Sequence, residues 1–390
     1  MTTTYVLMQN LRRNPLRTAL TAVAFALPMA IFVAAISFVV AMAEIGKANA
    51  KELRMAVHHK TTVINMLPEG TRKKIEAMDP DEKRLVAICG MRWFGGKVPN
   101  TQNAIQSLAA DPDTFPLVYT DAEMSEADKE AWNKDRQACV IGYGVAETYG
   151  WSPGSRIVLK SSVPPYLELE FHVIKILATK SRANVLYFRR DFLAESLKEA
   201  GEVNHASCNI FWIKCRDVES MRSLQTEIDA TFANSPNETK SEDENAFGAS
   251  FAQAAGNLPG LMQAMAIVVV VIIALVAGNT MMMSFRDRTR ELAVFKAIGF
   301  QNRRIFLIVL GESVSMALLG AIIGIVPAVI FLYLFPIRQM GLLPISALTV
   351  SPVSVIGSLV IALLVGLAAG LTPAVRALRL RTVDALRNVA

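Results

Sequence analysis

Charged side chains are missing from long parts of the chain. Asp, Glu, Lys and Arg are absent from 18–43, 245–285 and 339–375, and Glu312 alone interrupts 305–337. A helix needs about 20 consecutive apolar residues to cross the hydrocarbon core of a bilayer, where its backbone hydrogen bonds are satisfied internally. The pattern therefore predicts four membrane-spanning helices, at 18–43, 261–285, 305–335 and 350–373.

For the first segment, a cleaved signal peptide is the alternative. Arginines precede the segment, and it ends in Ala41-Met42-Ala43, which resembles a cleavage site. The apolar run is longer than the roughly 7–15 residues of a signal-peptide hydrophobic region. Its length therefore favours a membrane span.

Positively charged residues gather at the predicted membrane edges. They lie in 1–17, a predicted amphipathic helix, in the connection 286–304, and in 374–390, a predicted C-terminal helix. Because positively charged connections stay in the cytoplasm, both termini and 286–304 are expected there. Residues 44–260 and the short loop 336–349 then face the periplasm of a multi-pass protein of the bacterial cytoplasmic (inner) membrane.

The composition agrees with this division. The 390 residues are 52% hydrophobic and 19% charged, whereas an ordinary soluble domain is about 25% charged. The composition therefore disfavours a simple soluble globule. The net charge is +6, and the positive residues lie at the predicted membrane edges, where they set the topology and contact lipid headgroups. Membrane lipids and not nucleic acid are therefore the expected partners.

Residues 44–260 carry the patterns of a folded α+β domain with a mixed sheet. The expected strands are 138–142, 156–160, 166–176 and 209–214, the third with clear period-two alternation. The expected helices are 145–149 (closed by Gly150), 180–200 and 218–233. The predicted fold class is a membrane protein with an α-helical four-span transmembrane domain and a large α+β periplasmic domain inserted between spans 1 and 2.

The edges of this domain are predicted to be helical. Residues 44–57 and 245–258 carry few strand or turn signals and are interpreted as continuations of spans one and two. Two such stalks would connect the domain rigidly to the membrane. The polar, acidic stretch 235–245 is expected to be an exposed loop.

All four cysteines lie in the same domain, on a side of the membrane where disulfides are allowed. If 208–215 is one extended strand, Cys208 and Cys215 point to opposite faces and are too far apart to bridge. Two interpretations remain: four buried free thiols, or one disulfide that involves Cys89 or Cys139. No C-x-x-C spacing indicates a zinc or redox site.

The chain lacks the motifs of an ATPase or a hydrolase. Near Gly95-Gly96-Lys97, Met91 and Val98 stand where a Walker A loop requires Gly and Ser or Thr. His58 and His59 are adjacent, a spacing that suits neither a helical metal pair nor a catalytic dyad, and G-x-S-x-G is absent. We therefore expect a non-catalytic subunit that binds no cofactor or metal directly.

The connection 286–304 is predicted to contain an amphipathic helix. Its apolar stripe is Leu292, Phe295, Ile298 and Gly299, opposite Arg288, Glu291 and Lys296. Gly299 suits a C-cap, after which the next helix begins. Such a stripe between two spans is covered either by lipid headgroups, as in a plain linker, or by a soluble partner protein.

At this point the sequence resembles a family. The run RTRELAVFKAIGFQNRRI (288–305) is similar to the segment that follows the second span in MacB/FtsX-type (type VII) ABC transporter permeases. NLRRNPLRTALTAVAFAL (10–27) resembles the family's entry helix and first span. GLTPAVRALRLRTVDALRN (370–388) resembles its C-terminal end, a proline-containing turn before a short basic helix, and CVIGYGVAETYGWSPGSRIVL (139–159) its MacB-like periplasmic core domain.

The resemblance implies a permease subunit without a fused ATPase that dimerises and recruits an ABC ATPase subunit dimer, which binds ATP and Mg. In this family, spans one and two transmit opening and closing of the ATPases to the periplasmic domains. The implied ATPase-coupling residues are Arg288, Arg290, Glu291, Phe295, Lys296 and Gly299, with Phe295 as a knob in an ATPase groove.

Small residues in the spans predict close helix contacts. They are Ala22, Ala26, Ala30 and Ala34 in span one, Gly320 and Gly324 in span three, and Gly366 and Gly370 in span four. Packing within one chain and packing against a second permease copy, or a related permease, are both open. Pro28 removes a backbone hydrogen bond from span one, which gives a hinge hypothesis.

Glu312 is the one acidic residue inside an apolar span, and intramembrane charges are functional candidates. It follows Arg304 by about two turns, near the cytoplasmic side, where pairing with a neighbouring helix is cheap. The family that the sequence resembles often has an acidic residue here, so the resemblance favours structural anchoring over a proton relay.

The leading functional hypothesis is mechanotransmission by a permease that exports or extracts a lipid, lipoprotein, peptide or hydrophobic small molecule. A tripartite exporter would add a periplasmic adaptor (membrane fusion protein) and an outer-membrane component. The alternative is an FtsX-like regulator that transports nothing and activates a periplasmic cell-wall hydrolase. A membrane-anchored enzyme lacks a catalytic cluster, and a sensor that signals through 286–304 remains a further alternative.

Overall fold

The computed structural model describes residues 15–99, 104–254, 258–334 and 350–379. The chain forms two compact units, one built from the long apolar helices and one that covers Met42–Gly256. Most of the predicted N-terminal helix 1–17, the loop 336–349 and most of the C-terminal helix 374–390 lie outside the described residues.

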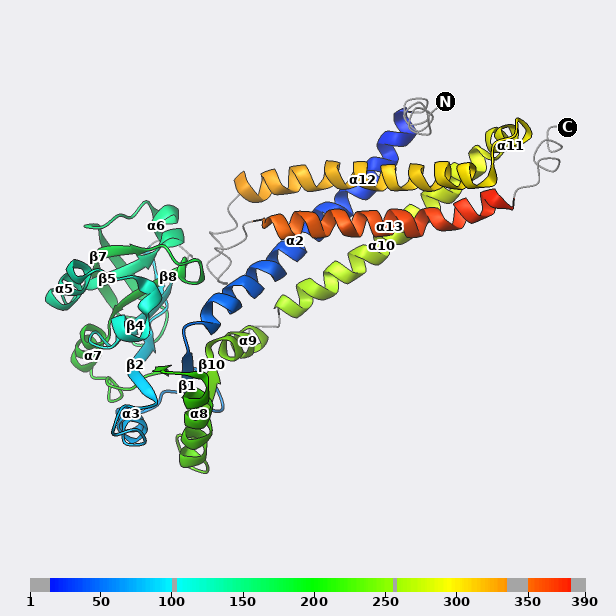
Figure 1. Ribbon diagram of the computed structural model, residues 1–390. Coiled ribbons are helices and arrows are strands. Elements are labelled where there is room, and N and C mark those ends of the chain that lie inside the picture. Colours follow the sequence, from blue (N-terminus) through cyan, green and yellow to red (C-terminus); the bar gives the residue numbers. More distant parts are fainter. Residues whose placement is uncertain (1–14, 100–103, 255–257, 335–349, 380–390) are drawn as a thin grey trace. The chain divides into compact units, whose positions relative to one another are not determined.

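Four helices in the described part of the chain are long and apolar enough to cross a bilayer. They are α2 (Pro15–Ala50), α10 (Leu258–Asp287), α12 (Asn302–Leu334) and α13 (Pro352–Leu378), and the short α11 (Thr289–Ala297) lies between α10 and α12 (Figure 1). Both Pro28 and Pro373 lie inside continuous helices. The proline-containing turn expected near 370–388 is therefore wrong, because α13 continues past Pro373 to Leu378.

Glycines in α12 allow it to approach α2. A Cβ atom on Gly324 would lie 2.1 Å from the backbone oxygen of Ala26, and one on Gly320 would lie 2.3 Å from the Cβ of Phe25. Ala22 is buried nearby, and Ala26, Ala30 and Ala34 are half-buried. This part of the small-residue pattern is used within the chain.

Glycines also allow α12 and α13 to approach each other closely. A Cβ on Gly366 would lie 2.8 Å from the Cβ of Ala317, and one on Gly370 would lie 2.6 Å from the Cβ of Ser313. The Ser313 hydroxyl donates a hydrogen bond of 2.8 Å to the Gly366 carbonyl. The two helices run side by side (Figure 1), so α12 and α13 pack backbone against backbone.

The second unit is built on one ten-stranded mixed sheet with the order β10-β1-β9-β2-β4-β8-β5-β7-β6-β3. The strands are β1 (Arg54–His59), β2 (Leu85–Trp93), β3 (Gly96–Lys97), β4 (Gln106–Ala110), β5 (Ala138–Gly142), β6 (Arg156–Ser161), β7 (Glu168–Leu177), β8 (Val185–Arg189), β9 (Ile210–Cys215) and β10 (Thr239–Asp243). Only β4–β8 and β5–β7 pair in parallel among these. The α+β class and the mixed sheet are confirmed.

Helices and short turns cover the sheet. They are α3 (Glu69–Glu76), α4 (Phe115–Val118), η1 (Thr120–Ala122), α5 (Glu126–Lys134), α6 (Tyr143–Tyr149), η2 (Lys180–Arg182), α7 (Arg190–Glu199), α8 (Val218–Phe232) and α9 (Glu244–Ala254). Alternate residues of β9 enter different cores, with Trp212 on one face and Phe211 and Ile213 on the other. This alternation is expected for a sheet covered on both faces.

Three local expectations are wrong. The first stalk ends at Ala50, and β1 occupies 54–59 because its side chains are buried in the sheet. The expected helix 180–200 contains η2, β8 and then α7, since the segment Val185–Arg189, apolar up to Phe188, is a buried central strand. The expected loop 235–245 contains β10, whose polar residues pair with β1 at the sheet edge.

The structure gives four buried free cysteines. The condition for placing Cys208 and Cys215 on opposite faces is not met, because β9 begins only at Ile210, and both side chains enter the same core. Burial raises the pKa of each of these two thiols to about 12. All four are placed as inert core residues.

Candidate coupling site

The helix α11 follows α10 after a single residue, Arg288, and ends in a Schellman motif. Gly299 has φ +99°, and its N–H donates to the Lys296 carbonyl at 3.2 Å. The Phe300 N–H donates to the Phe295 carbonyl at 3.0 Å, and the two phenyl rings lie 5.2 Å apart. Gly299 is needed here because an L side chain is strained at this φ.

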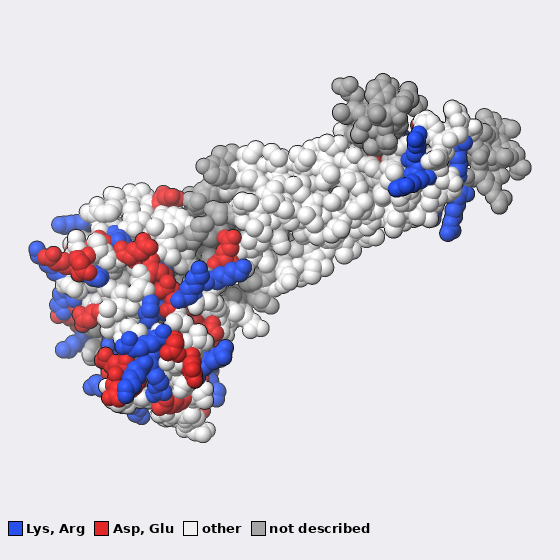
Figure 2. Space-filling view, viewed as in Figure 1, with Lys and Arg blue, Asp and Glu red and all other residues white. Residues whose placement is uncertain are grey.

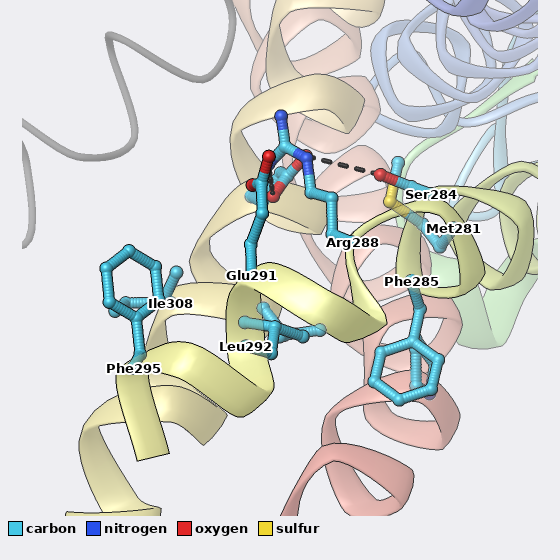
Figure 3. A pocket seen from close by; sticks show the side chains of 11 residues that line it. Met281, Ser284, Phe285, Arg288, Glu291, Leu292, Phe295 and Ile308 are labelled. Carbon is cyan, nitrogen blue, oxygen red and sulfur yellow. Dashed lines mark hydrogen bonds and ion pairs between the residues drawn. The ribbon is translucent and has the colours of Figure 1, made fainter. Parts of the chain in front are cut away.

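An ion pair joins the start of α11 to α12. Nη1 of Arg288 donates to Oε2 of Glu312 at 2.7 Å, and the side chains are 17% and 14% exposed. The Ser284 hydroxyl, at the end of α10, donates to Oε1 of Glu312 at 3.3 Å. Arg288 and Ser284 thus reach the same carboxylate from two helix ends, and dashed lines mark these bonds in Figure 3. The structure thus pairs Glu312 with a neighbouring helix end, as anchoring requires.

A second bond joins the end of α11 to α13. Nζ of Lys296 donates to the Leu378 carbonyl at 2.9 Å, which satisfies one orphan carbonyl at the C-terminus of α13. Between the two polar contacts, Leu292 packs with Ile305 and Ala377 in a small apolar core. The helix is therefore fastened to α12 and α13 at both ends and in the middle.

Phe295 faces this core. Together with Phe285 and Glu291 it lines the pocket between α10, α11, α12 and α13 (Figure 3). Phe295 also packs against Phe300 and is half-buried. In this structure its ring belongs to the attachment of α11, not to the outer surface of the helix.

The outer surface of α11 presents a different apolar pair. Val294 is 43% exposed and Ile298 is 71% exposed, one turn apart, with Arg290 exposed one turn before them. The predicted stripe is wrong for Ile298, because at about 100° per residue it lies about 120° around the helix from Leu292.

The same projection corrects the polar side of the predicted helix. Arg288 and Lys296 flank the buried face instead of opposing it, which explains why both make contacts within the chain. The apolar stripe predicted from the sequence does not include Val294. A residue-by-residue helical projection of 289–298 would have identified it, since the signal is entirely local.

The surroundings of α11 are basic. Figure 2 shows blue side chains at the end of the helical unit that carries α11 in Figure 1, whereas the middle stretch of the long helices is white in this view. The exposed arginines of this region are Arg286, Arg290, Arg303, Arg304, Arg376 and Arg379. An apolar pair within a positive surface fits a protein surface with acidic residues around an apolar depression.

The described residues contain no group of three or more His, Cys, Asp or Glu side chains placed to hold a metal ion.

Comparison with known proteins identifies the membrane part. Residues 264–381, which contain α11, α12 and α13, match the family described as FtsX-like permease C-terminal. An uncharacterized ABC transporter permease of Methanocaldococcus jannaschii is 24% identical over 87% of this chain and 86% of its own length.

Two relatives are named as exporters. The pyoverdine export ATP-binding/permease protein PvdT of Pseudomonas fluorescens is 26% identical over 79% of this chain and 46% of its own length. The macrolide export ATP-binding/permease protein MacB of Bdellovibrio bacteriovorus is 33% identical over 37% of this chain and 22% of its own length. The chain thus spans less than half of the length of either exporter.

The family resemblance read from 288–305 is confirmed by these matches. Four apolar helices with the α+β domain between the first two indicate a multi-pass membrane protein. The relatives named as permeases suggest a non-catalytic transmembrane subunit. Residues 264–381 match the FtsX-like permease domain, and the chain as a whole is similar to ABC transporter permeases, MacB-type ones among them.

Proposed function

We propose that this chain couples ATP hydrolysis by a separate ABC ATPase dimer to a conformational change of its periplasmic domain. In this proposal α11 lies in the cytoplasm with both termini, the Met42–Gly256 unit lies in the periplasm, and the membrane is the bacterial inner membrane. ATP and Mg are bound by the ATPase, and the permease acts with a second copy or a related permease.

One observation carries the proposal: α11 is fastened on one side and presents an apolar pair on the other. The bonds from Arg288 to Glu312 and from Lys296 to the Leu378 carbonyl attach it to α12 and α13. A helix attached in this way moves with those helices when a partner pushes on it. Val294 and Ile298 then provide the contact, and the attachment transmits the displacement.

The substrate is proposed as a lipid, lipoprotein, peptide or hydrophobic small molecule that is exported or extracted. Support comes from the exporters among the relatives and from helices that are apolar along their length, which suits mechanical transmission better than a water-filled pathway. An adaptor and an outer-membrane component would complete an exporter of the tripartite kind.

The proposal is tested by capture of partners. The tagged full chain is purified in mild detergent and its partners are identified by mass spectrometry, next to the double variant Val294→Glu/Ile298→Glu. The matched control, Ile64→Glu/Val203→Glu, adds the same two charges at positions of the other unit that are 82% and 88% exposed.

We expect an ABC ATPase with the unmodified chain and with the control, and its loss with the α11 variant, because a buried charge at the contact is costly. Absence of any ATPase from all three samples would overturn the proposal. A co-purifying adaptor or lipoprotein supports transport, whereas a co-purifying cell-wall hydrolase identifies the regulator instead.

The predicted role of Phe295 as the contact is tested in the same experiment. Phe295→Ala with Glu291→Arg changes two pocket-lining residues and leaves the outer pair intact. If this variant loses the ATPase while Val294→Glu/Ile298→Glu keeps it, the inner face is the contact and the outer pair is not.

A further inference from the structure

The chain enters and leaves the periplasmic unit at one place. The strand β1 begins with Arg54, separated by three residues from the end of α2, and α9 begins with Glu244 directly after β10. The two strands pair antiparallel at the sheet edge, with Met55 opposite Asp243. The ends of both stalk helices, α2 and α9, are therefore neighbours in the domain.

Two arginines and two carboxylates meet at this place. Arg54 donates to Oε2 of Glu244 at 2.7 Å and to the two carboxylate oxygens of Asp121 at 2.5 and 3.2 Å. Arg182 donates to Asp121 at 3.1 Å and to Oε1 of Glu244 at 3.1 Å. Each carboxylate thus binds both guanidinium groups, and each guanidinium binds both carboxylates.

Aromatic residues complete the cluster. Arg54 and Arg182 lie over the ring of Tyr119, 4.7 and 4.2 Å from its centroid. Nη1 of Arg182 also donates to the hydroxyl of Tyr187 at 2.9 Å. The charges are therefore enclosed by the domain core and not by solvent.

The cluster is buried and electrically balanced. Side-chain exposure is 0% for Arg54, 7% for Arg182, 15% for Asp121 and 9% for Glu244. Burial alone would raise the pKa of Asp121, but Arg182 and Arg54 hold that pKa below its usual value. Four buried, paired charges stabilise the folded state little more than apolar packing of the same volume would. The contribution of the cluster is therefore to hold chain segments in one position. Its bonds fix where β1 starts and where α9 starts.

We propose that Arg54, Asp121, Arg182 and Glu244 form a clamp that fixes the ends of the two stalk helices to each other and to the body of the periplasmic unit. The four are positioning residues. Arg54 lies where the chain enters the unit and Glu244 lies where the chain leaves it. Asp121 and Arg182 belong to η1 and η2 of the domain body. The clamp rests on the proposed function, because it stands where motion of the membrane helices would enter the domain.

A second contact strengthens the same junction. Lys214 of β9 donates to Glu52, which lies between α2 and β1, at 3.2 Å. The Thr120 hydroxyl, next to Asp121, donates to the same Glu52 carboxylate at 2.9 Å. The turn that follows α2 is thus also attached to the domain body.

The domain offers a matched control cluster away from the stalks. Asp111 is 8% exposed and is bound by Arg72 at 2.8 Å and by Arg190. The Gly90 N–H also donates to Asp111 at 2.6 Å. Asp111→Asn and Asp121→Asn therefore remove the same charge from carboxylates that each bind two arginines, but Asp121 alone of the two belongs to the clamp.

The test measures the distance between the stalk helices. Spin labels are attached to Lys47→Cys in α2 and Ala249→Cys in α9, both at exposed positions, while the native cysteines are buried. Pulsed electron resonance of the full chain in lipid nanodiscs then gives the distribution of label distances. This is compared among the unmodified background, Asp121→Asn and Asp111→Asn, and tryptophan fluorescence checks that each is folded.

We expect Asp121→Asn to broaden the distribution to at least about twice its original width, because local opening at the junction becomes cheap, while Asp111→Asn leaves it unchanged. Equal broadening by both variants, or by neither, overturns the clamp. If Asp121→Asn does not fold, Glu244→Gln is measured in its place with the same expected result. The measurement needs no ATPase, so its failure is distinguishable from failure of the coupling proposal.

Discussion

Breaking the ion pair between Arg288 and Glu312 should loosen α11 from α12. The two groups are 2.7 Å apart and their side chains are 17% and 14% exposed. An exposed pair contributes about 0–1 kcal/mol, and truncating one partner of a fully buried pair costs about 3–5 kcal/mol. For this intermediate burial we expect Glu312→Gln to cost about 2 kcal/mol, since a hydrogen bond to a charged group contributes about 1.5–3 kcal/mol.

The measurement is a double-mutant cycle. The unmodified chain, Arg288→Gln, Glu312→Gln and the double variant are unfolded reversibly in mixed micelles with increasing denaturing detergent, and loss of helix is followed by circular dichroism. Because the two residues bond directly, the interaction energy between them should be about 1–2 kcal/mol, well above the deviation of about 0.3–0.5 kcal/mol expected for independent sites.

The control cycle pairs Glu312→Gln with Arg303→Gln. Arg303 lies nine residues before Glu312 in the same helix, about 13 Å along its axis at 1.5 Å per residue, and is exposed. That cycle should be additive. If the Arg288 cycle is equally additive, the ion pair does not hold α11 and the attachment argument for coupling fails.

Three further predictions concern packing, thiols and pH. Gly324→Leu should prevent α12 from packing on α2 and lower the yield of folded chain, because its Cβ would meet the Ala26 carbonyl at 2.1 Å; normal yield and stability would contradict this contact. The four thiols, with the pKa values of Cys208 and Cys215 raised to about 12 by burial, should react with a maleimide only after unfolding; two unreactive thiols in denaturant without reductant would reveal a disulfide. The pKa of Asp121 is lowered in the folded state, so its contribution to the free energy of unfolding should be constant above the unfolded pKa of about 3.9 and decline as the pH falls toward the folded pKa. Urea titrations of the unmodified chain and Asp121→Asn, followed by tryptophan fluorescence, should therefore give free energies of unfolding that converge at acid pH. A difference between the two that does not depend on pH would refute the assignment.

Strand and helix assignments succeeded where the local pattern was unambiguous. The alternation over 166–176 correctly predicted β7, and the predicted helix 218–233 agrees with α8 to within one residue. They failed at 185–189 and 239–243, because a buried central strand has no alternation and a polar edge strand lacks apolar residues. Which of these segments joins the sheet is decided by their partners, β4, β5 and β1.

The sequence by itself determined the four apolar helices and the cap at Gly299, because a bilayer admits few backbone solutions and a Schellman motif is local. It also carried the family resemblance of 288–305. Only the tertiary structure decided which charges meet. Arg288 and Glu312 are 24 residues apart, Lys296 and Leu378 are 82 apart, and Arg54 and Glu244 are 190 apart. No periodicity encodes such pairs, because chain folding and not sequence spacing brings their side chains within hydrogen-bonding distance.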